Sequence, residues 1–284
     1  IDYIQGLGAT AIWITPPVAN QWWDPMVGYG GYHGYWARNF TEVDPHYGDL
    51  ATYQDLSRAL HANDMYLIQD IVANHTGNFF GYTDWDADDP TSGIVFNEDT
   101  VPVTVPSQAP FDLNDPTIPD HLAADIYNWT PPIQDFNDES QVVEWALADL
   151  DDLNTQNPVV RDALKDSYTY WIEMVGVDGF RIDTVKHVEA DFWADFIHSE
   201  NGVNAAAAAT GRDDFLGFGE VFFGSDPFDD NGERVVASYL GTADQPALNS
   251  MLNFPMYYTI NDVFAAGAPT AQMTYRLEAA QRVY

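Results

Sequence analysis

The chain has 284 residues, of which 46% are hydrophobic, so it is long enough for one large barrel or two ordinary domains. Its 10 Lys and Arg against 44 Asp and Glu give a formal net charge of −34. This charge argues against a nucleic acid or an anionic membrane as a partner and favours a neutral substrate. No run of about 18 apolar residues predicts a membrane span, and the absence of cysteine excludes disulfides and thiol chemistry.

The first part of the chain alternates between strand and helix patterns. In order, we expect a helix over 1–7, a buried strand over 11–15, an aromatic loop over 21–36, a helix over 48–63 and a buried strand over 65–73. The loop contains many Trp and Tyr rings, which have flat apolar faces and polar edges of the kind that sugars stack on. Because residue 1 already lies within a helical pattern and no cap precedes it, we expect the sequence to begin inside a longer chain.

Residues 76–156 break this alternation. They are rich in Asp, Pro, Asn and Thr and contain only short apolar segments. A stretch of about 80 residues is too long for a plain loop, so we expect a small irregular subdomain inserted after the strand over 65–73.

From residue 157 the alternation resumes. In order, we expect a helix over 157–175, a strand over 179–183, a helix over 188–199, a strand over 215–222, a helix over 231–241, a strand near 252 and helices over 257–266 and 270–284. The alanine run at 205–209 is a low-complexity segment. Five buried strands separated by helices favour an α/β barrel over an open doubly wound sheet, although the count alone leaves both possible.

The strand over 179–183 carries charge on one of its faces. Side chains alternate along a strand, so Arg181 and Asp183 point to one side while Phe180 and Ile182 point to the other. One interpretation is a structural ion pair; the other is that the strand ends at a polar pocket.

Polar residues also follow other strands of the predicted barrel. In a parallel α/β barrel, functional residues lie at the carboxyl ends of the strands, where Asp183 and Glu220 would face one mouth. A glycosidase needs two such carboxyl groups, one to attack the anomeric carbon and one to protonate the leaving oxygen.

Five segments of the chain together resemble signature regions of the α-amylase family of glycoside hydrolases. In chain order, they are residues 33–36, 70–75, 152–158, 179–187 and 217–221. The match is closest over 179–187, Gly-Phe-Arg-Ile-Asp-Thr-Val-Lys-His. The resemblance spans nearly the whole chain and implies a fold and a set of site residues.

The implied fold is α/β, a partial TIM (β/α)8 barrel with a domain B inserted after the third barrel strand. Residues 1–75 would form the first part of the barrel, 76–156 domain B and 157–284 the second part of the barrel. The first, seventh and eighth strands and the C-terminal β-domain of the family are expected to lie outside this chain. The family's third catalytic aspartate is also expected outside it, because no His-Asp pair follows Glu220.

The resemblance also implies a role for individual residues. Asp183 would be the nucleophile and Glu220 the general acid and base, with Arg181 holding Asp183 ionised and oriented. The remaining positions would bind substrate: His75 and Tyr35 at the sugar that is cleaved, Trp36 beside them, and Lys186 and His187 on the leaving-group side. Asp70 is expected to serve the internal hydrogen bonding of the barrel.

A Ca²⁺ ion between the barrel and domain B is implied by the same resemblance. The positions that match the family's ligands are Asn74, Asp152 and the backbone carbonyl of His187, and oxygen ligands suit this hard cation. A solvated acidic run is the alternative interpretation of Asp152, which follows three residues of which two are acidic.

We therefore predict a retaining α-glucan hydrolase that cleaves α-1,4 bonds of starch or maltooligosaccharides. The segment 33–40 also resembles cyclodextrin-forming transglycosylases, but Val221 stands where a Trp is associated with that group. An inactive sugar-binding barrel is an alternative of another class. We expect an α-glucan as the partner, no nucleic acid and no membrane, a monomer, and secretion or a periplasmic location. The 284 residues alone are expected to be inactive.

Overall fold

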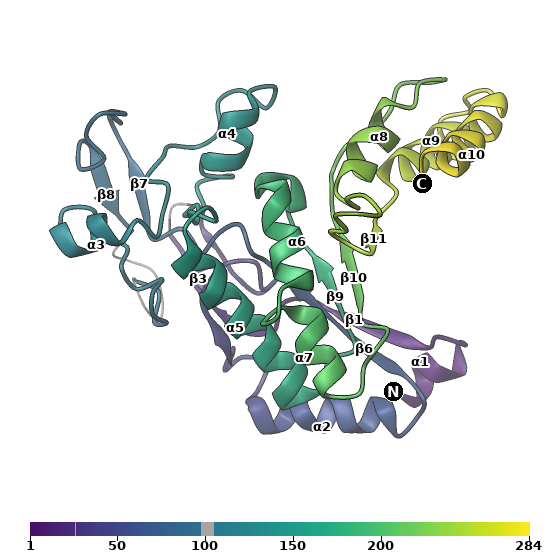
Figure 1. The fold of residues 1–284 in the computed structure, drawn as a ribbon, viewed down its shortest axis with the longest axis horizontal. Helices are drawn as coiled ribbons and strands as arrows, with labels where there is room; N and C mark the ends of the chain where they lie inside the picture. The colour runs from purple at the N-terminus through teal and green to yellow at the C-terminus, as the bar shows by residue number, and fades with distance from the viewer. Residues whose placement is uncertain (26, 98–104) are drawn as a thin grey trace.

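The computed structural model of the chain describes residues 1–25, 27–97 and 105–284. Its centre is a five-stranded parallel sheet (Figure 1) with the spatial order β1-β6-β9-β10-β11. The strands are β1 (Ala11–Ile14), β6 (Tyr66–Ile71), β9 (Gly179–Ile182), β10 (Leu216–Gly219) and β11 (Ser250–Met251). Because chain order equals spatial order, each crossover adds one strand to the same edge, as in a barrel and unlike in a doubly wound sheet.

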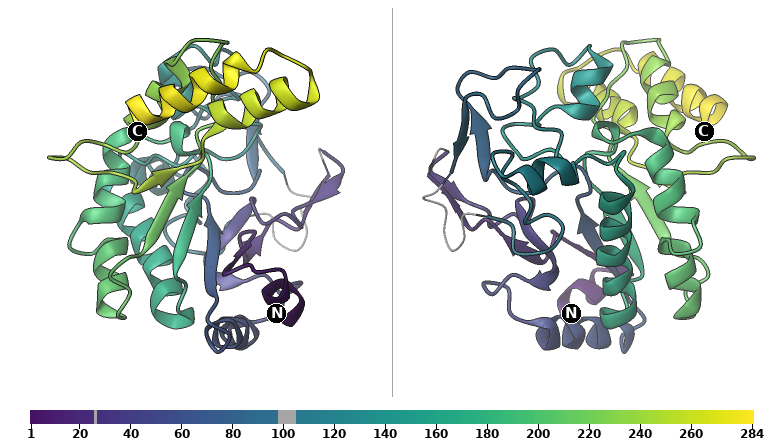
Figure 2. Two further views of the ribbon diagram at one scale, coloured as in Figure 1. Left: turned by 90° about the vertical axis from the view of Figure 1, so that its right-hand side faces the viewer. Right: turned by 60° about the vertical axis from the view of Figure 1, so that its left-hand side comes forward.

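Helices make the crossovers. They are α2 (Leu50–His61), α5 (Pro158–Val175), α6 (Ala190–His198), α7 (Val203–Ala209) and α8 (Asn231–Ser238). Helix α5 begins where Asn157 caps the backbone N–H of Val159 with Pro158 in the first turn, and its apolar stripe is buried. Figure 2 shows α5, α6 and α7 along one side of the sheet, which leaves the other side of the strands for polar groups.

The register of the sheet sets charged residues side by side. Asp70 on β6 pairs with Arg181 on β9, and Phe218 on β10 pairs with Arg181 from the other side. Phe180 and Ile182 are fully buried, as their alternation with Arg181 predicts. The Phe180 ring packs against Tyr168 of α5, while Arg181 binds Asp70 and Glu220, so the prediction that Phe180 and Arg181 face opposite ways is confirmed.

Several predicted elements differ in detail. Strand β1 is only half-buried, and Trp13 is 48% exposed, because β1 forms one edge of the sheet. The predicted strand near 252 ends at Met251, since Asn253 caps a new helix through the backbone N–H of Met256. The low-complexity alanine run over 205–209 forms most of helix α7.

The segment 76–156 leaves the sheet after β6 and returns before α5. It holds a hairpin of β7 (Phe80–Tyr82) with β8 (Ile94–Phe96) and two short helices, α3 (Pro119–Ala124) and α4 (Glu139–Glu144). Its two ends meet at an isolated bridge between His75 and Asp152. The ends of this segment therefore lie together beside the carboxyl end of β6.

The remaining elements flank the sheet. Helix α1 (Asp2–Gly6) precedes β1. The aromatic loop holds β3 (Trp23–Asp24) and β4 (Tyr29–Gly30), and the strands on either side of it, β2 (Val18–Asn20) and β5 (Ala37–Val43), pair with each other. After β11, α9 (Phe254–Ile260) continues into a π-helical turn, Asn261–Ala265, and α10 (Ala271–Val283) follows. In the part of the chain that the structure describes, no helix is long and apolar enough to cross a membrane.

Candidate active site

Arg181 lies at the centre of a group of three carboxylates. Its Nη1 is 2.8 Å from Asp70 Oδ1 and 2.7 Å from Asp183 Oδ1, and its Nη2 is 2.8 Å from Glu220 Oε2. The three acids come from the ends of β6, β9 and β10, which the parallel sheet brings to one edge. The arginine is therefore a bridge between the two predicted catalytic carboxylates, Asp183 and Glu220.

Asp70 helps to hold the Arg181 guanidinium in place. Its side chain is fully buried and accepts hydrogen bonds from Tyr35 Oη at 2.8 Å and from Trp13 Nε1 at 3.1 Å. The rings of Trp13 and Tyr35 also lie 5.5 and 5.9 Å from the Arg181 guanidinium carbon. Asp70 does serve internal hydrogen bonding, but its partners are residues of the site itself.

The carboxyl groups of Asp183 and Glu220 interact directly. Burial raises the pKa of both, and the Arg181 guanidinium opposes that rise. The contact between the two groups lowers the pKa of Asp183 and raises that of Glu220. When the pair holds one proton, the proton therefore resides on Glu220 and the charge on Asp183.

Thr184, which directly follows the predicted catalytic residue Asp183, has a strained backbone. Its φ is 50°, in the left-handed region, which is unfavourable for a β-branched side chain. Interaction with the Thr184 backbone N–H opposes the rise in the pKa of Glu220. Strain of this kind persists where the surrounding structure enforces it, as happens at functional sites.

His75 and Tyr35 lie together beside Asp70. The His75 ring is buried between Tyr35 O, 3.1 Å from Nε2, and Asn74 Oδ1, 2.9 Å from Nδ1. Burial lowers the pKa of His75 to about 4, so the ring is neutral near pH 7. A neutral imidazole and a phenol ring suit an uncharged sugar.

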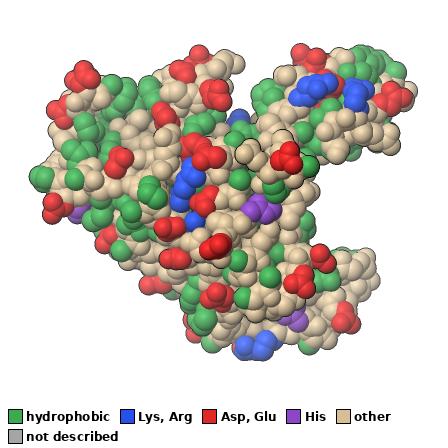
Figure 3. All heavy atoms as spheres, viewed as in Figure 1, with side chains coloured by type: hydrophobic (Ala, Val, Ile, Leu, Met, Phe, Trp, Pro, Cys, Tyr) green, Lys and Arg blue, Asp and Glu red, His purple; other side chains and the backbone are tan. Residues whose placement is uncertain are grey.

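On the other side of Glu220 is a cavity of about 260 Å³. Its lining comes from both the barrel strands and the segment 76–156: Phe136, Leu147, Thr184, Lys186, His187, Glu220 and Phe222. The predicted leaving-group residues Lys186 and His187 are therefore brought together with Glu220. Figure 3 shows that the face of the molecule is hollowed between the part that holds 76–156 and the part that holds α8, α9 and α10.

Trp36 has a different environment from the other predicted substrate residues. It is 7% exposed, and its ring packs against Tyr29 and His33 at 5.1 and 4.7 Å. Its backbone is fixed by Asn20, whose Oδ1 accepts from the Trp36 N–H. Trp36 therefore packs on His33, which stacks on Tyr35. A part for Trp36 in substrate binding stays a prediction.

The three predicted calcium ligands converge on one point. Asn74 Nδ2 donates to Asp152 Oδ1 at 2.7 Å and to the His187 carbonyl at 2.9 Å, and Asn128 Nδ2 donates to Asp152 Oδ2 at 2.6 Å. Within 1–25, 27–97 and 105–284, no group of three or more His, Cys, Asp or Glu side chains could hold a metal ion, and at this point one carboxylate is joined by amide and carbonyl groups.

This donor set fits calcium. Asp152 and the His187 carbonyl face this point with oxygens, and a turn of the Asn74 amide that exchanges Oδ1 and Nδ2 would add a third and leave Nδ2 facing His75 Nδ1. Oxygen ligands of mixed type suit Ca²⁺. Asp152 is 3% exposed, and burial raises its pKa well above its ordinary value. A buried carboxylate whose hydrogen-bond partners are neutral amides gains from a cation. The residues present therefore fit the ion that the resemblance implies.

Trp13 and Phe222 are among the site residues that the sequence did not predict. Trp13 contacts Asp70 and Arg181 but lies in a strand that reads as plain core, so no local pattern marks it. Phe222 lines the cavity two residues after Glu220, and its position after a strand end was a usable signal.

Comparison with known proteins places this site in a family. Residues 1–210 match the model of the alpha amylase catalytic domain. The chain is 33% identical, over 90% of its length, to an alpha-amylase of Streptomyces lividans, and 32% identical, over 78% of its length, to a cyclomaltodextrin glucanotransferase of Klebsiella oxytoca. The chain therefore belongs to the alpha-amylase family of glycoside hydrolases, whose catalytic domain is a (β/α)8 barrel.

A solved structure shows the same likeness in space. The alpha-amylase of Geobacillus thermoleovorans, solved in complex with acarbose, has a TM-score of 0.65 and 30% identity to this chain. The match covers 92% of this chain and 45% of that one, and the chain spans 29% and 31% of the two curated relatives. In length, the chain therefore corresponds to part of these proteins, and its described residues form a sheet of five parallel strands.

Proposed function

We propose that the full-length protein is a retaining α-glucan hydrolase that cleaves α-1,4 bonds of starch or maltooligosaccharides through a covalent intermediate on Asp183. The observation that carries this proposal is that one guanidinium, that of Arg181, binds both Asp183 and Glu220, at 2.7 and 2.8 Å. An inverting enzyme keeps its two carboxyl groups about 6.5 to 9.5 Å apart to admit a water molecule, whereas a retaining enzyme keeps them about 5 to 5.5 Å apart. Two carboxyl groups bound to one guanidinium support the shorter separation.

In the first step, Asp183 attacks the anomeric carbon while Glu220 gives its proton to the leaving glycosidic oxygen. The bond from C1 to that oxygen breaks as the bond from Asp183 Oδ to C1 forms. In the second step, Glu220 takes a proton from water, and the water oxygen displaces Asp183 from C1. Arg181 stabilises each carboxylate as it carries charge, because both lie within 3 Å of its nitrogens.

Substrate binding follows from the placement of neutral and aromatic groups. We assign the sugar that is cleaved to the space beside Tyr35 and His75 and the leaving-group sugars to the cavity at Lys186, His187 and Phe222. Trp36 packs against His33, whose ring in turn stacks on Tyr35. A net charge of −34 is compatible with a neutral glucan and would repel a polyanion.

We assign the calcium ion to Asn74, Asp152 and the His187 carbonyl. When bound, the ion supplies positive charge that holds the ends of segment 76–156 to the barrel. The chain's own contribution is to fix His75, because the Asn74 amide also contacts its ring at Nδ1. We also propose that the five strands of the central sheet, β1, β6, β9, β10 and β11, are barrel strands two to six and that 76–156 is domain B. The full-length protein is proposed to be a secreted or periplasmic monomer.

Replacement of the nucleophile tests the function. In the full-length protein, Asp183→Asn should reduce kcat on soluble starch by about 10⁴-fold or more, while Asp191→Asn, a change at an exposed position of α6, should leave it unchanged. Unchanged turnover in Asp183→Asn would refute the assignment. A full-length wild-type protein that binds maltoheptaose but releases no sugar would instead favour an inactive sugar-binding barrel.

A transglycosylase is the second candidate, and the similarity to a cyclomaltodextrin glucanotransferase supports it. Both reactions share the first step and differ in whether water or a sugar hydroxyl attacks the intermediate. Product analysis on soluble starch separates them. Linear maltooligosaccharides indicate hydrolysis, and cyclic or lengthened glucans indicate transfer.

A further inference from the structure

The loop 221–230 connects the acid residue of the site to helix α8. It begins directly after Glu220, and its second residue, Phe222, is 59% exposed and lines the cavity with Lys186. The Phe222 ring also packs against Phe254 of α9 at 5.0 Å. The path of this loop therefore determines the shape of the leaving-group side of the cavity.

The far end of the loop has a strained backbone. Phe228 has a φ of 60°, which is unfavourable for a bulky side chain. Its ring packs against Tyr275 of α10 at 5.7 Å. A conformation of this kind persists only where neighbouring contacts hold it in place.

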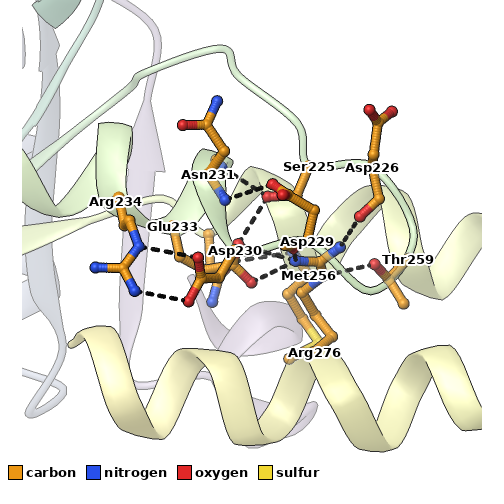
Figure 4. A network of polar contacts seen from close by, with 12 residues as sticks. Ser225, Asp226, Asp229, Asp230, Asn231, Glu233, Arg234, Met256, Thr259 and Arg276 are labelled. Atoms are coloured by element: carbon orange, nitrogen blue, oxygen red, sulfur yellow. Dashed lines mark hydrogen bonds and ion pairs between the residues drawn. The ribbon is translucent and has the colours of Figure 1, made fainter.

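Arg276 on α10 supplies those contacts (Figure 4). Its Nη2 donates to the Asp226 carbonyl at 3.1 Å and its Nη1 to the Asp229 carbonyl at 2.8 Å, so that it binds the loop on both sides of Phe228. The Arg276 Nε donates to Thr259 Oγ1 of α9 at 2.9 Å. One side chain thus ties the loop to two helices.

A buried acid completes the arrangement. Glu233 on α8 is fully buried, and its Oε1 lies 2.6 Å from Arg276 Nη1. Its Oε2 accepts from Ser225 Oγ at 2.7 Å, and Ser225 Oγ accepts from the Gly232 N–H at 2.8 Å. A buried ion pair is not needed to pack two helices, since apolar residues of the same volume do so at least as well. The contacts to the loop backbone are what an apolar pair could not supply.

We propose that Arg276, held by Glu233, is a positioning residue that fixes loop 221–230 and thereby places Phe222 against the leaving-group sugar. This role rests on the proposed function. It acts through the loop and touches neither substrate nor the reacting atoms. Its loss should weaken substrates that extend into the leaving-group side and spare those that do not.

The variant Arg276→Lys in the full-length protein isolates this role. Lysine keeps the charge opposite Glu233 but lacks the planar fork that reaches both carbonyls. We expect KM for maltoheptaose to rise about tenfold, the loss expected when one aromatic contact is misplaced, with kcat/KM for α-maltotriosyl fluoride unchanged. Fluoride occupies no sugar site when it leaves, so this substrate does not report on Phe222.

Hydrogen exchange gives a readout that does not depend on activity. Backbone amides of 224–230 should exchange at least about tenfold faster in Arg276→Lys, while those of α10 keep their protection. A second variant, Arg276→Met with Glu233→Met, retains an apolar contact between the helices and should give the same two results. Arg58→Met is the matched control, because Arg58 is an exposed arginine of α2 that pairs with Asp55 and lies outside the loop.

The outcomes separate the two proposals. Loop amides as protected in Arg276→Lys as in the wild type would overturn the positioning role, whatever the activity. An equal loss on both substrates would also overturn it, because it would show a general structural effect. Wild-type protein inactive on both substrates would overturn the proposed function, while faster exchange in the loop would still support the clamp on 221–230.

Discussion

Asp70 and Asp183 bind the same nitrogen of Arg181, at 2.8 and 2.7 Å. The register of β6 against β9 sets Asp70 directly beside Arg181, so this contact follows from the sheet itself. Burial raises the pKa of Asp183, and the negative charge of Asp70 also raises it. The hydrogen bond from Arg181 to Asp70 keeps the guanidinium in place. Asp70 thus affects the proposed nucleophile, Asp183, although the Asp70 side chain is itself fully buried.

Replacement of Asp70 should change both geometry and acidity. In Asp70→Asn, Arg181 loses one of its three charged partners, and we expect the free energy of unfolding to fall by about 1 to 3 kcal/mol. A misplaced Arg181 should lower kcat by about 10²-fold. The acidic limb of the pH profile should move to lower pH, because Asp183 loses a neighbouring negative charge. Trp13→Phe removes only one hydrogen bond to Asp70 and keeps an aromatic ring beside Arg181, so it serves as the control. An acidic limb that stays in place would contradict the coupling.

The pH dependence of kcat/KM should be bell-shaped, with Asp183 ionised and Glu220 protonated in the active form. Burial, followed by the charge of Asp183, raises the pKa of Glu220 above its ordinary 4.5. Activity should therefore be lost as pH rises through that raised pKa, and as pH falls through the pKa of Asp183. In Asp183→Asn, NMR titration of Glu220 should show a lower pKa than in the wild type. A pKa that does not fall would show that the two groups do not interact.

Removal of calcium should lower stability. An ion present at about 100 times its dissociation constant contributes about 2.7 kcal/mol to the free energy of unfolding. We expect chelator to lower the Tm of the full-length wild type and to have little effect on Asp152→Asn, which lacks the carboxylate. Asp149→Asn, at an exposed position nearby, should respond like the wild type. Full thermal stability of the wild type in chelator would contradict the assignment.

The sequence predicted the central sheet well because its strands are short apolar runs between amphipathic helices. The strands near 68, 180 and 218 each lie within a described strand, and the chain order equals the spatial order. The ends of elements were less predictable. Met251 closes a strand only because Asn253 caps the next helix, and this capping choice competes locally with the apolar run.

The candidate site was predictable where a motif carried it and not where pairing across the sheet did. Asp183, Glu220 and Arg181 follow from the resemblance. The shared contact of Arg181 with Asp70 and Glu220 depends on strand register, which no single segment encodes. The clamp by Arg276 joins residues 47 to 50 positions apart and lies outside any motif.

The covalent intermediate on Asp183 is the central claim, and Glu220→Gln provides the means to trap it. In this variant, α-maltotriosyl fluoride still transfers its sugar to Asp183, because fluoride leaves without a proton, whereas water attacks slowly without a general base. Mass spectrometry of peptides from the full-length Glu220→Gln protein should show one maltotriosyl group on the peptide that contains Asp183, and none when Asp183→Asn is added. A sugar on another residue, or turnover of the fluoride with inversion and no adduct, would contradict the account.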